Sequence, residues 1–134
     1  MKKRLIFPAI AFFLPFYVYC YTLCPTVSVY GDAGEFPTFA VISGFGHPPG
    51  YPLFILILKL FLLLPFGNPA FKANLAAAFI GAASISLFYL LTKRITQDRF
   101  SSLVAALALA FSQIFWKNAL VAEVFNLLAF FVIL

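Results

Sequence analysis

Two carboxylates lie three residues apart in the segment Gly31-Asp32-Ala33-Gly34-Glu35. On a helix or a turn, side chains at this spacing face the same way. One carboxylate of such a pair can take a proton from an acceptor hydroxyl, or both can hold a divalent cation. The structural alternative is a capping box, in which Asp32 caps a helix and Glu35 reaches back. We treat Asp32 and Glu35 as candidate catalytic residues, since a cap would also fix the position of an acid.

His47 is the only histidine of the chain, and Pro48 and Pro49 follow it directly. The residue before a proline is pushed out of the α region, so the backbone at His47 is extended. An imidazole can take a proton near neutral pH or donate one to a phosphate. The alternative is a histidine at a membrane interface that bonds a carbonyl. We therefore treat His47 as a candidate substrate-binding residue.

Lys72 and Glu123 each have a chemical and a structural interpretation. Lys72 can neutralise a lipid-linked phosphate as it leaves, or its side chain can extend along apolar surface to the headgroups. Glu123 has Asn118 and Asn126 near it and can bind a polar group of a substrate. Alternatively, it is an ordinary acid at a helix start, favoured by the helix dipole. The sequence leaves both alternatives open.

The elements that position these residues belong to a membrane protein. The chain has 134 residues, of which 64% are hydrophobic and 10% charged. A soluble domain is about half apolar and about a quarter charged, and a domain of this size buries only about two-thirds of its surface. The composition excludes a soluble globular protein and a disordered one. We expect an all-α, multi-pass helical membrane protein. Its basic residues are scattered or sit at the ends of apolar runs, so we expect no nucleic-acid partner.

Apolar runs predict membrane spans at residues 5–23, 68–92 and 100–118, with the start of a fourth at 124–134. Residues 24–67 form a predicted exoplasmic loop with interfacial helices. Within this loop we expect a short helix over residues 35–43, ended by Gly44. The fourth run is about 16 Å long as a helix, half a membrane. We therefore expect the chain to be the truncated N-terminal part of a single membrane domain.

The basic residues that flank the apolar runs predict the topology. If residues 51–66 crossed the membrane, the next helix would carry its basic end to the outer side, against the positive-inside bias. If that segment lies in the outer interface or re-enters, both basic clusters are cytoplasmic. The clusters are Lys2, Lys3 and Arg4, and Lys93, Arg94 and Arg99. We expect a cytoplasmic N-terminus, with Asp32, Glu35, His47 and Glu123 on the exoplasmic side.

Several of these segments resemble one membrane family. They are Gly31-Asp32-Ala33-Gly34-Glu35, His47-Pro48-Pro49-Gly50-Tyr51-Pro52-Leu53-Phe54, residues 64–75 and Val121-Ala122-Glu123-Val124-Phe125. Together they are similar to the N-terminal part of the protein O-mannosyltransferase-like family, long catalogued as a domain of unknown function and related to the GT-C glycosyltransferases. The resemblance runs from the first helix to the end of the chain. It implies a GT-C-like fold whose first outer loop carries the acids, with two helices along the membrane.

The resemblance also implies a reaction. An inverting GT-C enzyme moves a sugar from a polyprenyl-phosphate carrier to an acceptor hydroxyl on the exoplasmic face; mannose is one candidate, and the sequence does not identify the sugar. Asp32 would act as the base with Glu35 beside it, and the lipid phosphate would leave. The implied substrate-binding residues are His47, Tyr51, Lys72, Asn74 and Glu123. Family members often carry an arginine at the position of Lys72, and a lysine keeps the charge but loses the bidentate grip on phosphate.

The implied partners are a polyprenyl-phosphate-linked sugar donor, a protein or glycan acceptor, and membrane lipids. We assign no metal ligand and require no cofactor, although the paired carboxylates leave a divalent cation open. The expected location is the bacterial inner membrane or, in a eukaryote, the endoplasmic reticulum. The donor cavity needs further helices, so the isolated piece is expected to be inactive.

A second hypothesis is a non-catalytic membrane subunit that binds the lipid carrier or a partner helix bundle. A transporter with loop acids for proton coupling fits less well, because its acids should lie near the bilayer midplane.

Overall fold

The computed structural model describes residues 5–29, 31–44 and 46–134. The predicted N-terminal basic cluster, Lys2, Lys3 and Arg4, lies outside these described residues. Within the described ranges the regular structure is entirely helical, which confirms the predicted all-α class. The helices are α1 (Ile6–Thr22), α2 (Glu35–Ile42), α3 (Pro52–Leu62), α4 (Pro69–Thr96), α5 (Arg99–Ala110), α6 (Gln113–Ala119) and α7 (Phe125–Ile133).

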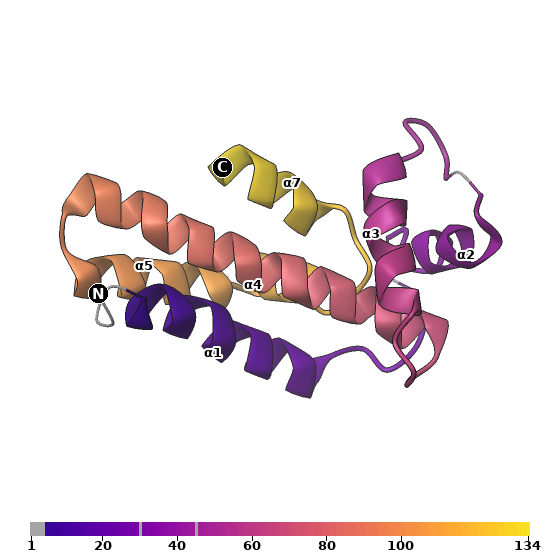
Figure 1. The fold of residues 1–134 in the computed structure, drawn as a ribbon, viewed down its shortest axis with the longest axis horizontal. Helices are drawn as coiled ribbons and strands as arrows, with labels where there is room; N and C mark the ends of the chain where they lie inside the picture. Colours follow the sequence, from indigo (N-terminus) through magenta and orange to yellow (C-terminus); the bar gives the residue numbers. More distant parts are fainter. Residues whose placement is uncertain (1–4, 30, 45) are drawn as a thin grey trace.

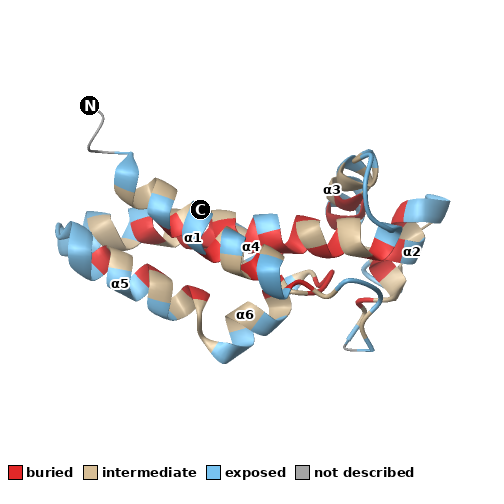
Figure 2. Cartoon of the chain, turned by 90° about the horizontal axis from the view of Figure 1, so that it is seen from below, coloured by how far each residue is buried: buried red, intermediate tan, exposed pale blue. Residues whose placement is uncertain are grey.

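The helix α4 is the central element of the fold. It has 28 residues, so it is about 42 Å long. The helices α1, α5 and α7 pack along it (Figure 1). Buried residues follow α4 over most of its length (Figure 2), and most of them are small, among them Ala73, Ala76, Ala77 and Ala82. Small side chains let neighbouring helices approach closely, as in membrane helix bundles.

Local signals in the sequence determine both ends of α4. Asn68 caps the N-terminus, since its side chain accepts a hydrogen bond from the Phe71 N–H at 2.8 Å. Pro69 occupies the first turn, where its missing N–H is tolerated. The helix ends at Thr96; the next residue, Gln97, adopts the left-handed conformation, and Lys93 and Arg94 lie in the last turn. The predicted span at 68–92 therefore lies within a helix that continues for one further turn.

Among the described helices, α4 alone is long and apolar enough to cross a membrane as one straight helix. The pair α5 and α6 passes the same test only as one broken span, bent by 66°. Its break divides the run predicted as a span at 100–118. Ser112 lies at the break, where its hydroxyl donates to the Leu109 carbonyl at 2.8 Å. Such a local bond competes with continuation of the helix.

The short helices α2 and α3 lie together at the N-terminal end of α4, and α3 runs across the long axis of the bundle (Figure 1). Phe36 of α2 packs edge-on against Phe54 of α3, with ring centroids 5.1 Å apart. Both rings belong to a core cluster that includes Ala73 and Ala76 of α4. The structure thus contains the predicted short helix. It ends at Ile42, and Ser43 adopts the left-handed conformation in place of Gly44.

Candidate active site

Asp32, Glu35 and His47 come together around the N-terminus of α2. Asp32 lies in the turn before this helix, Glu35 is its first residue, and His47 comes from the loop that follows it. The His47 N–H donates to Glu35 Oε1 at 2.8 Å, and His47 Nδ1 lies 2.9 Å from Glu35 Oε2. His47 Nε2 lies 3.7 Å from Asp32 Oδ2. The three candidates therefore form one group, which we call the carboxylate–histidine cluster.

The main chain of Asp32, not its side chain, starts α2. The Asp32 carbonyl accepts hydrogen bonds from the Glu35 N–H at 2.9 Å and the Phe36 N–H at 3.2 Å. Gly34 is the cap residue, and the helix has no side-chain cap bond. The capping-box alternative for Asp32 and Glu35 is therefore not what the structure contains. The Asp32 side chain is 45% exposed, so a substrate hydroxyl can reach its carboxylate.

Glu35 and His47 change each other's protonation. Two hydrogen bonds from His47, the first from its backbone N–H, hold the pKa of Glu35 below its ordinary value. The hydrogen bond to Glu35 raises the pKa of His47 above 6.5, and the charges of Glu35 and Asp32 act in the same direction. An ionised Glu35 therefore faces an imidazole whose protonated form it favours. The second imidazole nitrogen, Nε2, is then a donor directed toward Asp32.

The pKa of His47 can be measured directly, because its NMR signals are the only histidine signals of this chain. We expect a titration midpoint above 6.5, and Glu35→Gln should lower it toward 6.5. A raised pKa means that His47 stabilises the fold at low pH and loses this contribution as pH rises through its own pKa. The lowered pKa of Glu35 has the opposite effect on the pH dependence of stability: the stabilisation from Glu35 is lost as pH falls through that pKa.

The pair therefore stabilises the loop most between these two pKa values. Asp98→Asn, at the opposite end of α4, is the matched control and should leave the His47 midpoint unchanged. A midpoint at or below 6.5 in the wild-type chain would contradict the hydrogen-bonded pair.

Glu123, which is far from the cluster in the sequence, contacts it in the fold. It lies between α6 and α7 and is 2% exposed. Its Oε1 accepts a hydrogen bond from the Asp32 backbone N–H at 2.7 Å. Burial raises the pKa of Glu123, and the Asp32 N–H opposes this rise. The three acids predicted to share one side, Asp32, Glu35 and Glu123, are thus neighbours.

Gly31 makes the contact between Asp32 and Glu123 sterically feasible. Its φ is +55°, a conformation that side chains of L-residues rarely adopt. A Cβ atom at this position would overlap Glu123 Oε1. The glycines around Asp32 and Glu35 are visible in the sequence. The partner that requires Gly31 is 92 residues away, so no local signal could have shown this need.

The other predicted binding residues fall into two groups. The Tyr51 ring lies 5.8 Å from the His47 ring, so Tyr51 borders the cluster. Lys72 Nζ donates to the Leu62 carbonyl at 3.2 Å, at the end of α3. Asn74 is 1% exposed, and all the polar atoms of its side chain bond backbone groups. The structure therefore gives Lys72 and Asn74 structural contacts and places Tyr51 at the cluster.

Comparison with known proteins identifies the family. Residues 32–134 match the family described as the Protein O-mannosyl-transferase TMEM260 N-terminal domain. The chain belongs to this family. The match begins at Asp32 and includes Glu35, His47 and Glu123, which confirms the family resemblance seen in the sequence.

Two curated relatives show the extent of the similarity. The chain is 40% identical over 103 residues to Protein O-mannosyl-transferase TMEM260 of Mus musculus, covering 76% of the chain and 15% of the relative. It is 32% identical over 118 residues to Protein O-mannosyl-transferase tmem260 of Dictyostelium discoideum, covering 86% of the chain and 14% of the relative. The matched region is thus about a seventh of the length of these relatives. No solved structure matches the chain.

In this family member the cluster also has the donor set of a divalent-cation site. One ligand atom from each of Asp32, Glu35 and His47 lies within 4.8 Å of the others. A mixed carboxylate and imidazole set suits zinc or manganese. Coordination through His47 Nε2 would leave Nδ1–H bonded to Glu35 Oε2, and this bond would fix the orientation of the ring. The cluster can therefore serve either as a proton-transfer group or as a cation holder.

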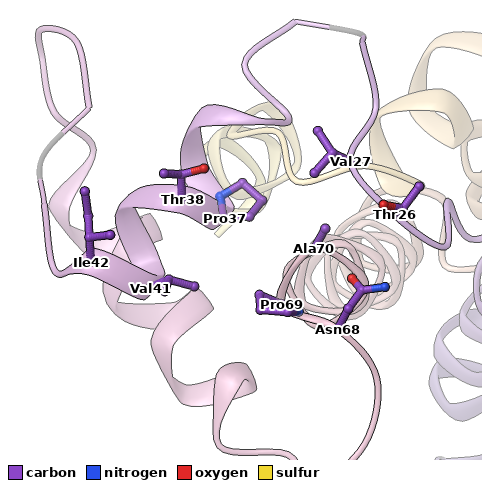
Figure 3. A pocket seen from close by; sticks show the side chains of 9 residues that line it. All are labelled: Thr26, Val27, Pro37, Thr38, Val41, Ile42, Asn68, Pro69 and Ala70. Carbon is purple, nitrogen blue, oxygen red and sulfur yellow. The ribbon is translucent and has the colours of Figure 1, made fainter.

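A separate groove lies between α2, the loop after α1 and the first turn of α4 (Figure 3). Its volume is about 450 Å³. The lining is Thr26, Val27, Pro37, Thr38, Val41, Ile42, Asn68, Pro69 and Ala70. Among the described residues that line this groove there is no charged side chain and none of the seven candidate residues. Its chemistry suits an apolar chain better than a sugar phosphate.

Proposed function

We propose that this chain is the base-carrying N-terminal part of an inverting mannosyltransferase that takes mannose from a polyprenyl-phosphate carrier. Membership of a family with relatives named protein O-mannosyl-transferase supports the mannosyl reaction. One observation carries the assignment of the base. The Asp32 carboxylate is exposed, while its own backbone N–H is fixed by the buried Glu123. An accessible acid on a fixed backbone is what general base catalysis requires.

In the proposed reaction, Asp32 removes the proton of the acceptor hydroxyl while the hydroxyl oxygen attacks C1 of mannose. The bond between C1 and the phosphate oxygen breaks, and its electron pair stays on the phosphate, which leaves as the lipid phosphate anion. Attack from the face opposite the phosphate inverts C1. His47 Nε2 lies 3.7 Å from Asp32 Oδ2, so its imidazole stands on the side of the attacking hydroxyl and orients it beside Asp32, while Glu35 holds that imidazole in place. Tyr51 borders the sugar beside His47.

We infer that the chain is a multi-pass membrane protein whose cluster faces the exoplasm. The cluster lies at the N-terminal end of α4, and Lys93, Arg94 and Arg99 lie at its other end. The positive-inside bias assigns that basic end to the cytoplasm. Exposed apolar side chains on α1 and α7, such as Phe13 and Val132, suit contact with lipid. The crosswise α3 suits a helix in the outer interface, in the endoplasmic reticulum or a bacterial inner membrane.

One experiment tests both the identity of the sugar donor and the side of the membrane on which transfer occurs. The full-length protein is placed in sealed vesicles of known orientation that contain polyprenyl-phosphate mannose. An acceptor peptide that cannot cross the membrane is offered on one side at a time. We expect mannosylated peptide only when the peptide is on the exoplasmic side. Nucleotide-linked mannose, without the lipid donor, should give no product.

Transfer to a peptide on the cytoplasmic side would contradict the proposed topology. Transfer from nucleotide-linked mannose alone would contradict the proposed donor. Absence of transfer, with lipid donor still bound, is the result expected of a non-catalytic subunit and would contradict the proposed enzyme.

A further inference from the structure

Two segments far apart in the sequence are joined beside the carboxylate–histidine cluster. The first is the loop after α1, and the second is the connection between α6 and α7. The Cys24 N–H donates to the Leu120 carbonyl at 3.3 Å, and the Asp32 N–H donates to Glu123 at 2.7 Å. The loop that carries Asp32 is therefore fixed near both of its ends to the same connection.

Asn74 of α4 forms hydrogen bonds to both of these segments and so strengthens the connection between them. Its amide nitrogen donates to the carbonyls of Cys24 at 2.8 Å and Thr26 at 3.1 Å. Its amide oxygen accepts from the Ala122 N–H at 2.9 Å. One side chain, 1% exposed, thus bonds the loop and the residue just before Glu123 at the same time.

Glu123 completes the junction at Asp32. A buried carboxylate is costly unless it is hydrogen-bonded, and Glu123 is 2% exposed. Its Oε1 accepts a hydrogen bond from the Asp32 backbone N–H, and the absence of a Cβ atom at Gly31 leaves room for this oxygen. Satisfied buried polar networks specify one geometry, because their alternatives leave groups unpaired. The contact therefore restricts where the Asp32 backbone can lie.

We propose that Asn74 and Glu123 form a clasp that holds the Asp32 backbone, and with it the Asp32 carboxylate, at the position from which it removes the acceptor proton. Glu123 is thus a positioning residue, and its acceptor oxygen matters more than its charge. This inference rests on the proposed function. It differs from the sequence-based expectation that Asn74 and Glu123 bind substrate directly.

The test separates the reach of the Glu123 side chain from its charge. Glu123→Gln keeps an acceptor oxygen at the same reach without the charge. Glu123→Asp keeps the charge but withdraws the oxygen by one methylene. Both variants are made in the full-length protein, and kcat and the donor KM are measured for mannose transfer from polyprenyl-phosphate mannose. Asp98→Asn, at the far end of α4, is the control and should match wild type.

We expect Glu123→Gln to keep kcat within about threefold of wild type. Glu123→Asp should lower kcat by about 100-fold with little change in donor KM, since a displacement of about 1 Å can cost this much. Loss of transfer in the folded Gln variant, with activity kept in the Asp variant, would overturn the clasp and give the Glu123 charge a direct role. Wild-type kcat in both variants would overturn it too.

The proposed function itself can fail separately. An active Asp32→Asn variant would refute the catalytic base, whatever the Glu123 variants do. An inactive Asp32→Asn variant with two fully active Glu123 variants would refute only the clasp.

Discussion

Gly31→Ala is expected to lower mannosyl transfer by the full-length protein by at least about 100-fold. The left-handed φ of +55° costs an alanine about 1–2 kcal/mol. The added methyl also overlaps Glu123 Oε1 and must displace either this carboxylate or the Asp32 backbone. Displacement of the reacting group by about 1 Å costs about 100-fold in rate. The measurement is initial transfer rate at saturating donor, together with the thermal unfolding midpoint in the same detergent.

Gly50→Ala is the matched control for this substitution. Gly50 also has a positive φ, +84°, but a Cβ there would meet no atom of the described residues within 4 Å. It therefore carries the same kind of backbone cost without a clash. We expect Gly50→Ala to retain most of the transfer rate. Equal losses in the two variants would show that backbone strain alone explains the effect and that the contact with Glu123 does not matter.

Local sequence patterns predict the ends of the main helices. The Asn68-Pro69 pair marks the start of α4, and the basic residues Lys93 and Arg94 mark its last turn. The short helix at Glu35–Ile42 was expected because of Gly44, but it ends one residue earlier than that signal indicates, with Ser43 in the left-handed conformation. The break between α5 and α6 was not predicted, because the run around Ser112 is apolar almost throughout and the serine acts only through a local hydrogen bond.

The composition of the cluster was predictable, but its assembly was not. The spacing of Asp32 and Glu35 predicts a shared face. Nothing local shows that the loop after α2 returns to bring His47 within 2.9 Å of Glu35. The contact between Asp32 and Glu123 spans 91 residues and depends on how α6 and α7 pack against α4.

Asn74 was expected to have a role that the structure does not give it. The resemblance to the family implies that Asn74 binds substrate. The structure instead uses its amide to satisfy three backbone groups from two loops. A single sequence cannot distinguish these two uses, because substrate binding and hydrogen bonds to the backbone both place a polar side chain in an apolar helix.

Asp32→Asn in the full-length protein tests the proposed base most directly. Asparagine keeps the size of the side chain and the backbone N–H that bonds Glu123, so the loop should stay in place. It removes the negative charge that faces His47 and, with it, the capacity to take a proton. General base catalysis contributes about 100- to 10,000-fold, so we expect transfer to fall by about 1,000-fold with little change in donor KM.

Membrane insertion and the thermal unfolding midpoint should equal those of wild type, and Asp98→Asn should transfer mannose normally. A folded Asp32→Asn variant that transfers mannose at the wild-type rate would contradict the assignment of Asp32 as the base.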